Sequence, residues 1–297
     1  LAQKIRSTVQ GGQIHSLDEL NEAISGIVME YNQYPQEELG GLTPEQVSKL
    51  IYIDWDSPES IIPTFPIIPD EDIVRTPIMM DVHAFLKGII EEGGSIKTTS
   101  TGKLNRNFIK KMMERFSPPT EHHAWILEHK KTLNEDDVIH IHLIRVLTRL
   151  AGLIRKQKSF FKITKKAEKY LQDQYAGELY ALLFKTHFRK FNLAYLDGTP
   201  DNQPLQATIA YTFYAIGQHM KDWKKPEDIA KQITLPIVQD YIYEQIDLKI
   251  QVESRILVPL VRFGLLEIRA LPKKEKRIFN KYEYRKTKLY DDFFIFS

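Results

Sequence analysis

Apolar residues recur at helical spacing along most of the chain, which predicts a mainly helical protein. The sequence Ser16-Leu17-Asp18-Glu19 has the form of a capping box, in which the serine and the glutamate bond to the first backbone amides of a helix. A second box begins at Thr43, with Pro44 in the first turn and Gln46 closing the box. The pattern therefore predicts two amphipathic helices near the start of the chain, the first over residues 17–31.

One motif recurs further along: an apolar helix ends at a glycine, a hairpin of two short strands follows, and another helix begins. Its clearest copy places Gly152 directly after a helical stripe. Glycine suits the left-handed residue that follows a helix. The predicted elements of this copy are a helix that ends near Leu150, strands at residues 153–154 and 160–163, and a helix from Lys165 towards Phe188.

Two further stretches share parts of this motif. The later one has three leading helices, of which the third is long and is expected to kink at Pro259. The earlier one, residues 94–102, has room for a single short strand and is read as a degenerate copy. The predicted elements of the later copy are helices over residues 207–220 and 226–233, a helix that runs to Phe263, and strands over residues 265–270 and 282–287.

The stretch from Gly152 to Ala167 resembles the wing of the MarR and PadR families of winged-helix proteins. In those families the return strand ends in an aromatic residue, any residue, an apolar residue and Thr, and a small residue follows in the next helix. These places hold Phe161, Ile163, Thr164 and Ala167 here. The resemblance implies a winged-helix fold over residues 135–172.

The last copy resembles the same wing less closely, and this resemblance covers residues 206–297. It has Lys286 at the apolar position and Tyr290 at the small position, although Tyr284 and Thr287 match. The stretch Gly40-Gly41-Leu42-Thr43-Pro44-Glu45-Gln46 also resembles one found in bacterial proteins of unknown activity, which implies a bacterial origin.

Charge and proline content divide the chain into regions. Residues 1–80 hold 4 Lys and Arg against 13 Asp and Glu, whereas the remainder is basic. Five prolines between Asp56 and Pro77 exclude a helix or a central strand, so this stretch is expected to be an extended connector. We predict a mainly α fold with short β-hairpins (α+β): an acidic helical segment over residues 1–77, and tandem winged-helix-like domains over residues 78–198 and 199–297.

The chain has no cysteine, which excludes disulfides, thiolate zinc sites, iron–sulfur clusters and cysteine nucleophiles. The longest apolar runs are too short for a membrane helix, and the first residues lack the apolar core of a signal peptide. We therefore expect a cytoplasmic protein with no membrane partner.

Motifs for nucleotide binding, acyl transfer or metalloprotease chemistry are missing, so no catalytic residue and no cofactor is assigned, and an enzyme of unrecognised type stays an alternative. Histidines cluster at His122, His123 and His129, but a zinc site needs three or four converging ligands. His140 and His142 point to different sides of one helix, so we assign no metal. The pair of carboxylates around Trp55 is expected to form a turn and a cap.

The basic hairpins raise a second hypothesis, because winged helices commonly place the helix before the wing in the DNA major groove and use the wing on the backbone. Lys and Arg at these positions supply salt-dependent contacts to phosphates. The candidate nucleic-acid contacts are Arg155, Lys156, Lys158, Lys162, Lys165, Lys166, Lys273, Lys274, Lys276, Arg277 and Lys281.

The helices in front of these hairpins argue against DNA. One opens with the acidic sequence Glu135-Asp136-Asp137, and the other carries Asp240, Glu244 and Asp247. Only Arg145, Thr148 and Arg149 look suited to DNA contacts. We therefore predict a non-catalytic interaction scaffold that binds an unknown protein partner or forms a homodimer, with DNA binding through the basic wings as the alternative.

Overall fold

The computed structural model describes residues 2–10, 16–57, 60–61, 70–116, 133–195, 197–242, 245–272 and 281–296. Within these ranges the protein is mainly helical, with one three-stranded and one two-stranded antiparallel sheet. The predicted mainly α fold with short hairpins (α+β) is thus confirmed. None of the helices in these ranges is long and apolar enough to cross a membrane.

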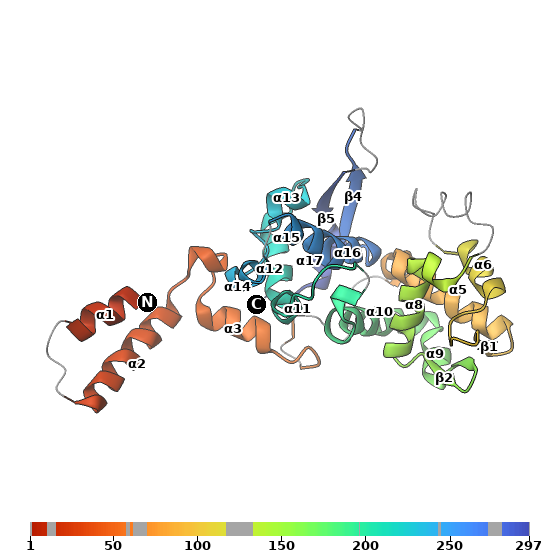
Figure 1. Ribbon diagram of the computed structural model, residues 1–297, viewed down its shortest axis with the longest axis horizontal. Helices are drawn as coiled ribbons and strands as arrows, with labels where there is room; N and C mark the ends of the chain where they lie inside the picture. Colours follow the sequence, from red (N-terminus) through yellow and green to blue (C-terminus); the bar gives the residue numbers. More distant parts are fainter. Residues whose placement is uncertain are drawn as a thin grey trace.

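An arm of two helices projects from the body at the N-terminal end (Figure 1). The backbone amide of Glu19 donates to the side chain of Ser16, and both hydrogen bonds of the capping box at Thr43 are present, as the sequence predicted. Residues 58–59 and 62–69 of the proline-rich connector lie outside the described residues. The prediction that residues 56–77 hold no helix was wrong for residues 70–74, which follow the last of its closely spaced prolines and form a short helix. The elements of this region are α1 (Ala2–Gln10), α2 (Leu17–Gln33), η1 (Glu37–Leu39), α3 (Pro44–Tyr52) and α4 (Asp70–Val74).

The first unit runs from α5 to α9 and contains the three-stranded sheet, whose strand order is β1-β3-β2. The stretch over residues 94–102, which we expected to be a degenerate copy of the motif, instead supplies the edge strand β1 of this sheet. Its elements are α5 (Pro77–Glu91), β1 (Ser95–Lys97), α6 (Arg106–Met113), η2 (Glu135–Asp137), α8 (Ile139–Leu150), β2 (Ile154–Gln157), β3 (Phe160–Ile163) and α9 (Lys165–Tyr170).

The second unit repeats this order around the two-stranded sheet. A single bridge between Lys224 and Tyr284 stands where β1 stands in the first unit. The long third helix is interrupted by a π-helical turn before Pro259, because proline has no N–H for the helical ladder. The elements are α12 (Ile209–His219), α13 (Pro226–Ile229), α14 (Pro236–Asp240), α15 (Gln245–Val252), η6 (Glu253–Leu257), α16 (Val258–Arg262), β4 (Leu266–Ala270), β5 (Tyr282–Lys286) and α17 (Lys288–Phe293).

The recurring sequence motif has a local physical cause in both units. Gly152 and Gly264 take φ of 74° and 71°, a conformation that residues with a side chain rarely adopt, and so end their helices. Thr164 then donates from Oγ1 to the carbonyls of Gly152 and Leu153, and the same Oγ1 accepts from the amide of Ala167. Thr287 makes the equivalent three bonds in the second unit. One threonine thus fastens the end of one helix to the start of the next.

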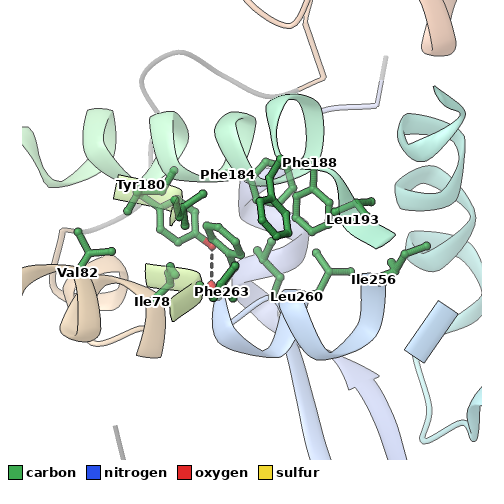
Figure 2. Close-up of a cluster of buried hydrophobic side chains, with 14 of the residues drawn as sticks. Ile78, Val82, Tyr180, Phe184, Phe188, Leu193, Ile256, Leu260 and Phe263 are labelled. Atoms are coloured by element: carbon green, nitrogen blue, oxygen red, sulfur yellow. Dashed lines mark hydrogen bonds between the residues drawn. The ribbon is translucent and has the colours of Figure 1, made fainter. Parts of the chain in front are cut away.

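The segment between the units forms a core that both share. Figure 2 shows Tyr180 and Phe184 of this segment between Val82 of α5 on one side and Leu260 and Phe263 on the other. The helix predicted to continue from Lys165 to Phe188 is broken into short pieces. The elements of the segment are η3 (Asp173–Tyr175), α10 (Ala176–Lys185), η4 (Thr186–Lys190), η5 (Leu193–Tyr195) and α11 (Gln203–Ala207).

Three further contacts tie the units together. The hydroxyl of Tyr180 donates to the carbonyl of Phe263 at 2.6 Å. A side chain at Gly264 would place its Cβ 2.8 Å from Thr76, so the end of α16 lies against the residue before α5. Phe293 and Phe294 are buried beside Phe184.

Candidate nucleic-acid interface

The first hairpin, β2 and β3 with the turn between them, carries cations without neutralising partners. Arg155, Lys156, Lys158 and Lys165 are exposed, and Lys162 is partly exposed. Among the described residues, none of these five side chains forms an ion pair. Lys158 lies in the turn with φ of 53°, and its side chain is exposed.

The second hairpin, β4 and β5, has its cations paired. Arg269 contacts Glu283 and Arg285 contacts Glu267, each at 2.7 Å, across the two strands. Both arginines also lie over the ring of Trp223, at 4.4 and 4.8 Å from its centre.

Neighbouring cations of the second unit are paired as well. Lys281 contacts Glu227 at 3.4 Å, and Lys286 contacts Asp291 at 2.5 Å. Lys273, Lys274, Lys276 and Arg277, which we had predicted as contacts, lie outside the described residues. The described part of this hairpin is thus close to neutral, in contrast to the first.

Strand register explains which side chains share the outer face of the first sheet. Lys162 pairs with Ser95 on one side and with Arg155 on the other. Phe160 pairs in the same way with Lys97 and Gln157. Residues directly opposite each other in antiparallel strands project to the same face.

These six residues define what we call the cationic face: Ser95, Lys97, Arg155, Gln157, Phe160 and Lys162. The opposite face of the same strands, with Ile96, Ile154 and Phe161, is buried against the helices. The cationic face holds three cations and an aromatic ring and no carboxylate.

Lys97 and Phe160 were missed at the sequence level because residues 94–102 were assigned to a separate copy. The alternation in Ser95-Ile96-Lys97, polar, apolar, polar, was the available signal for a half-buried strand.

A polar hollow of about 830 Å³ continues from the cationic face beside β1. Lys97 lines both, and Thr99, Asn105, Arg106 and Asn107 line the rest of its polar wall. Glu92 also lines the hollow, but it is paired with Lys111 at 2.8 Å. The hollow therefore extends the polar and basic character of the face over a second element, α6.

The helix in front of the first hairpin, α8, does not offer the surface that we expected. Arg145 is buried and donates from Nε to Glu135 at 2.5 Å, and Thr148 is fully buried and donates to the carbonyl of Ile144. Neither side chain is available to DNA. Of the three residues that we predicted to suit DNA contacts, Arg145, Thr148 and Arg149, only Arg149 is exposed.

The acidic sequence that opens this region is also used internally. Glu135 is 1% exposed and accepts from the backbone amide of Leu104 and from Arg145, while its Oε1 lies 2.6 Å from Nδ1 of His142. Asp136 pairs with Lys103. The expectation that these carboxylates face DNA phosphates was therefore wrong for Glu135, because it faces the interior.

The helix in front of the second hairpin is buried as well. Arg255 is 2% exposed and binds Asp197 through two hydrogen bonds, which holds the loop between the units against η6. Asp240 ends the separate helix α14 instead of lying on the long helix. Glu244 and the side chain of Asp247 lie outside the described residues.

Two more predicted contacts have local roles. Lys166 donates to the carbonyl of Ala151 at 3.0 Å and so caps α8, and burial and the charge of Lys190 lower its pKa. The two hairpins point away from each other in different parts of the molecule, so they do not form one continuous face (Figure 1).

The described histidines do not form a metal site. His140 contacts Asp81 at 2.5 Å and His142 contacts Glu135, so each is paired with a different carboxylate. The described residues contain no group of three or more metal-ligating side chains. His122, His123 and His129 lie outside the described residues. Asp54 accepts from the amide of Asp56, which forms the turn that we expected there.

The fold and this surface define a helix–hairpin protein whose first hairpin is cationic. The family model described as the Y4jL N-terminal domain matches residues 75–176, which are the first unit and the beginning of α10. No curated protein and no solved structure matches the chain. The likeness to this family is therefore confined to the part of the chain that bears the cationic face.

Proposed function

We propose that the protein is a non-catalytic, cytoplasmic bacterial binding protein of the winged-helix superfamily, and that it contacts nucleic acid through the cationic face. The observation that carries the proposal is the difference between the hairpins: among the described residues, the cations of the first have no carboxylate partners, whereas those of the second are paired. A group of unpaired cations on a surface without carboxylates gives that surface a positive electrostatic potential, which attracts phosphate backbones. The superfamily assignment is supported by an order that both units share: a first helix, further helices, a hairpin and a closing helix. The Lys224–Tyr284 bridge of the second unit takes the place of strand β1 in the first.

The expected mode of binding is largely independent of base sequence. Backbone contacts position a nucleic acid and carry no sequence information, whereas base edges are read by elements that enter a groove. Because α8 exposes few polar side chains, it has few groups that could bond to base edges in the major groove, so we do not propose that α8 recognises base sequence.

The proposal is tested by fluorescence anisotropy with a labelled duplex of random sequence at increasing salt. About three phosphate contacts give a slope of about −3 in log K against log salt. The variant K97Q/R155Q/K162Q, which removes the three cations of the cationic face, is expected to lose most of that slope while its circular dichroism spectrum stays unchanged. Absence of binding by the wild-type protein at low salt, to this duplex and to a labelled single strand of the same length, would rule out the proposal.

A second candidate is the scaffold function, with a second copy of this chain as the partner. An apolar groove of about 660 Å³ lies between α3, α12 and the C-terminal residues, with Leu50, Ile53 and Phe296 in its lining. The arm helix α2 projects from the body, exposes Leu17 and Met29, and is acidic at its start, while Lys49 lines the groove. We expect α2 of one copy to occupy the groove of another.

Light scattering on the eluting protein tests the scaffold candidate. The dimer is expected to dissociate in the variant Leu50→Asp, which places a charge in the groove. The separate variant Leu17→Asp, which places a charge on the arm, should have the same effect. A strict monomer in the wild-type protein would contradict this candidate and leave the nucleic-acid proposal untouched.

A further inference from the structure

We propose that the cationic face binds single-stranded nucleic acid, with one base stacked on Phe160 and neighbouring phosphates on Lys97, Arg155 and Lys162. The inference rests on the proposed function and names the class of nucleic acid. It follows from the position of Phe160, from the cations around it and from the hollow that continues beyond them.

Phe160 is an aromatic side chain on the middle strand of the sheet that remains 37% exposed. Apart from Phe296, which is partly exposed, the chain buries its other phenylalanines in the described ranges to 9% exposure or less, for example Phe161 on the adjacent position at 0%. Among the described residues its ring contacts no other aromatic ring and no cation. An exposed ring in the middle of a sheet is thus free to receive a flat ligand.

The surroundings of Phe160 select an anionic ligand with a flat part. Lys97 and Gln157 lie directly opposite Phe160 on the two neighbouring strands, and Lys162 follows two positions along the same strand. Directly opposite residues are about 5 Å apart and diagonal ones about 7–8 Å, so every cation of the face lies within reach of a phosphate next to the stacked base. Nucleotides combine a flat base with a phosphate at this range.

Stacking distinguishes single strands from duplexes. Bases in a duplex are stacked on one another and leave only their edges and the backbone accessible, whereas an unpaired base offers its whole face to an aromatic side chain. Of the polar side chains on α8, the helix that would enter a major groove, only that of Arg149 is exposed. A single strand can therefore use both Phe160 and the cations, and a duplex only the cations.

The hollow beside β1 indicates where the bound single-stranded nucleic acid continues beyond Phe160. It begins at Lys97 and is lined by Arg106 and Asn107, whose exposed guanidinium and amide groups face the next nucleotide, whereas the amide of Asn105 is engaged in capping α6. Since Glu92 there is paired with Lys111, its carboxylate is neutralised.

The test compares labelled oligo-dT and oligo-rU single strands with a duplex of the same length, by anisotropy at one low salt concentration. Wild-type protein is expected to bind a single strand more tightly than the duplex. Loss of one stacked base corresponds to about 1–3 kcal/mol, or about 5- to 150-fold in affinity, so Phe160→Leu should weaken single-strand binding by about tenfold or more. Duplex binding should change little, and Phe160→Trp should retain the preference.

Ile268→Ala serves as the matched control, because Ile268 is an exposed apolar residue on a strand of the second hairpin. Its affinities should equal those of the wild type. Equal affinity for single strand and duplex, unaffected by Phe160→Leu, overturns this inference but leaves the proposed function standing. Lack of binding to any of the probes overturns both, and a preference for rU over dT would identify RNA as the source of the strand.

Discussion

Thr164 and Thr287 hold the same place in the two units and give the recurring motif its chemistry. Each hydroxyl donates to the end of one helix and accepts from the first turn of the next. The sequence predicted where these helices start and stop, because capping depends on residues close together in the chain.

Replacement of Thr164 by Ala removes one cap and two carbonyl contacts. We expect a loss of about 1–2 kcal/mol in the free energy of unfolding. Urea denaturation followed by circular dichroism measures it. Thr164→Ser keeps the hydroxyl and should recover most of the stability; an alanine variant as stable as the wild type would show that the hydroxyl has no such role.

His187 makes stability depend on pH. It is 4% exposed, and burial, together with the charge of Arg262, lowers its pKa to about 3. Its pKa in the unfolded chain is about 6.5, so below that pH the unfolded state takes up a proton that the folded state refuses. Stability is therefore retained above about pH 6.5 and lost progressively as pH falls towards 3.

Urea denaturation at pH 7 and at pH 5 checks this dependence. His187 alone should cost the wild-type protein about 2 kcal/mol between the two values. His83 and His140, whose pKa values are also lowered chiefly by burial, act in the same direction. His187→Phe should thus reduce the pH dependence without abolishing it, and an unchanged dependence in that variant would contradict the assignment.

The two hairpins show how similar elements differ in electrostatic character. Their sequences are both basic, and sequence reasoning treated them alike. The decisive difference, pairing of Arg269 and Arg285 with Glu283 and Glu267, depends on cross-strand register and was not visible without the structure. Register also brought Lys97 next to Phe160 from a stretch that had been assigned elsewhere.

Removal of the two carboxylates from the second hairpin should release its arginines. We expect the variant E267Q/E283Q to bind a random duplex more tightly at low salt and to steepen the salt slope by up to about two. Anisotropy at several salt concentrations measures both. An unchanged affinity would indicate that Trp223, which contacts both arginines, holds them away from phosphates.

The two units and the segment between them pack into one body, from which the arm of α1 and α2 projects (Figure 1). Sequence analysis placed a domain boundary near residue 198, and that boundary stays a prediction. The shared core could not be predicted from the sequence, because Tyr180, Phe184 and Phe263 belong to segments that are distant in the chain. Arg145 was placed wrongly for a similar reason, because Glu135 and Phe161, which bury it, come from other segments of the first unit.

A shared core predicts one cooperative unfolding transition. Circular dichroism and tryptophan fluorescence should give coincident urea curves. Phe184→Ala should shift both curves together, with a loss of about 3–5 kcal/mol for a buried phenylalanine. Two separate transitions, of which only one responds to the substitution, would show that the units fold independently.

The claim that the first hairpin, and not the second, contacts nucleic acid is tested most directly by a matched pair of variants. R155Q/K162Q and R269Q/R285Q each remove two cations from the strands of one hairpin. We predict that the salt slope of binding to a random duplex falls by about 1.8 in the first variant and stays at the wild-type value in the second. Equal losses in the two variants, or a loss confined to the second, would contradict the account.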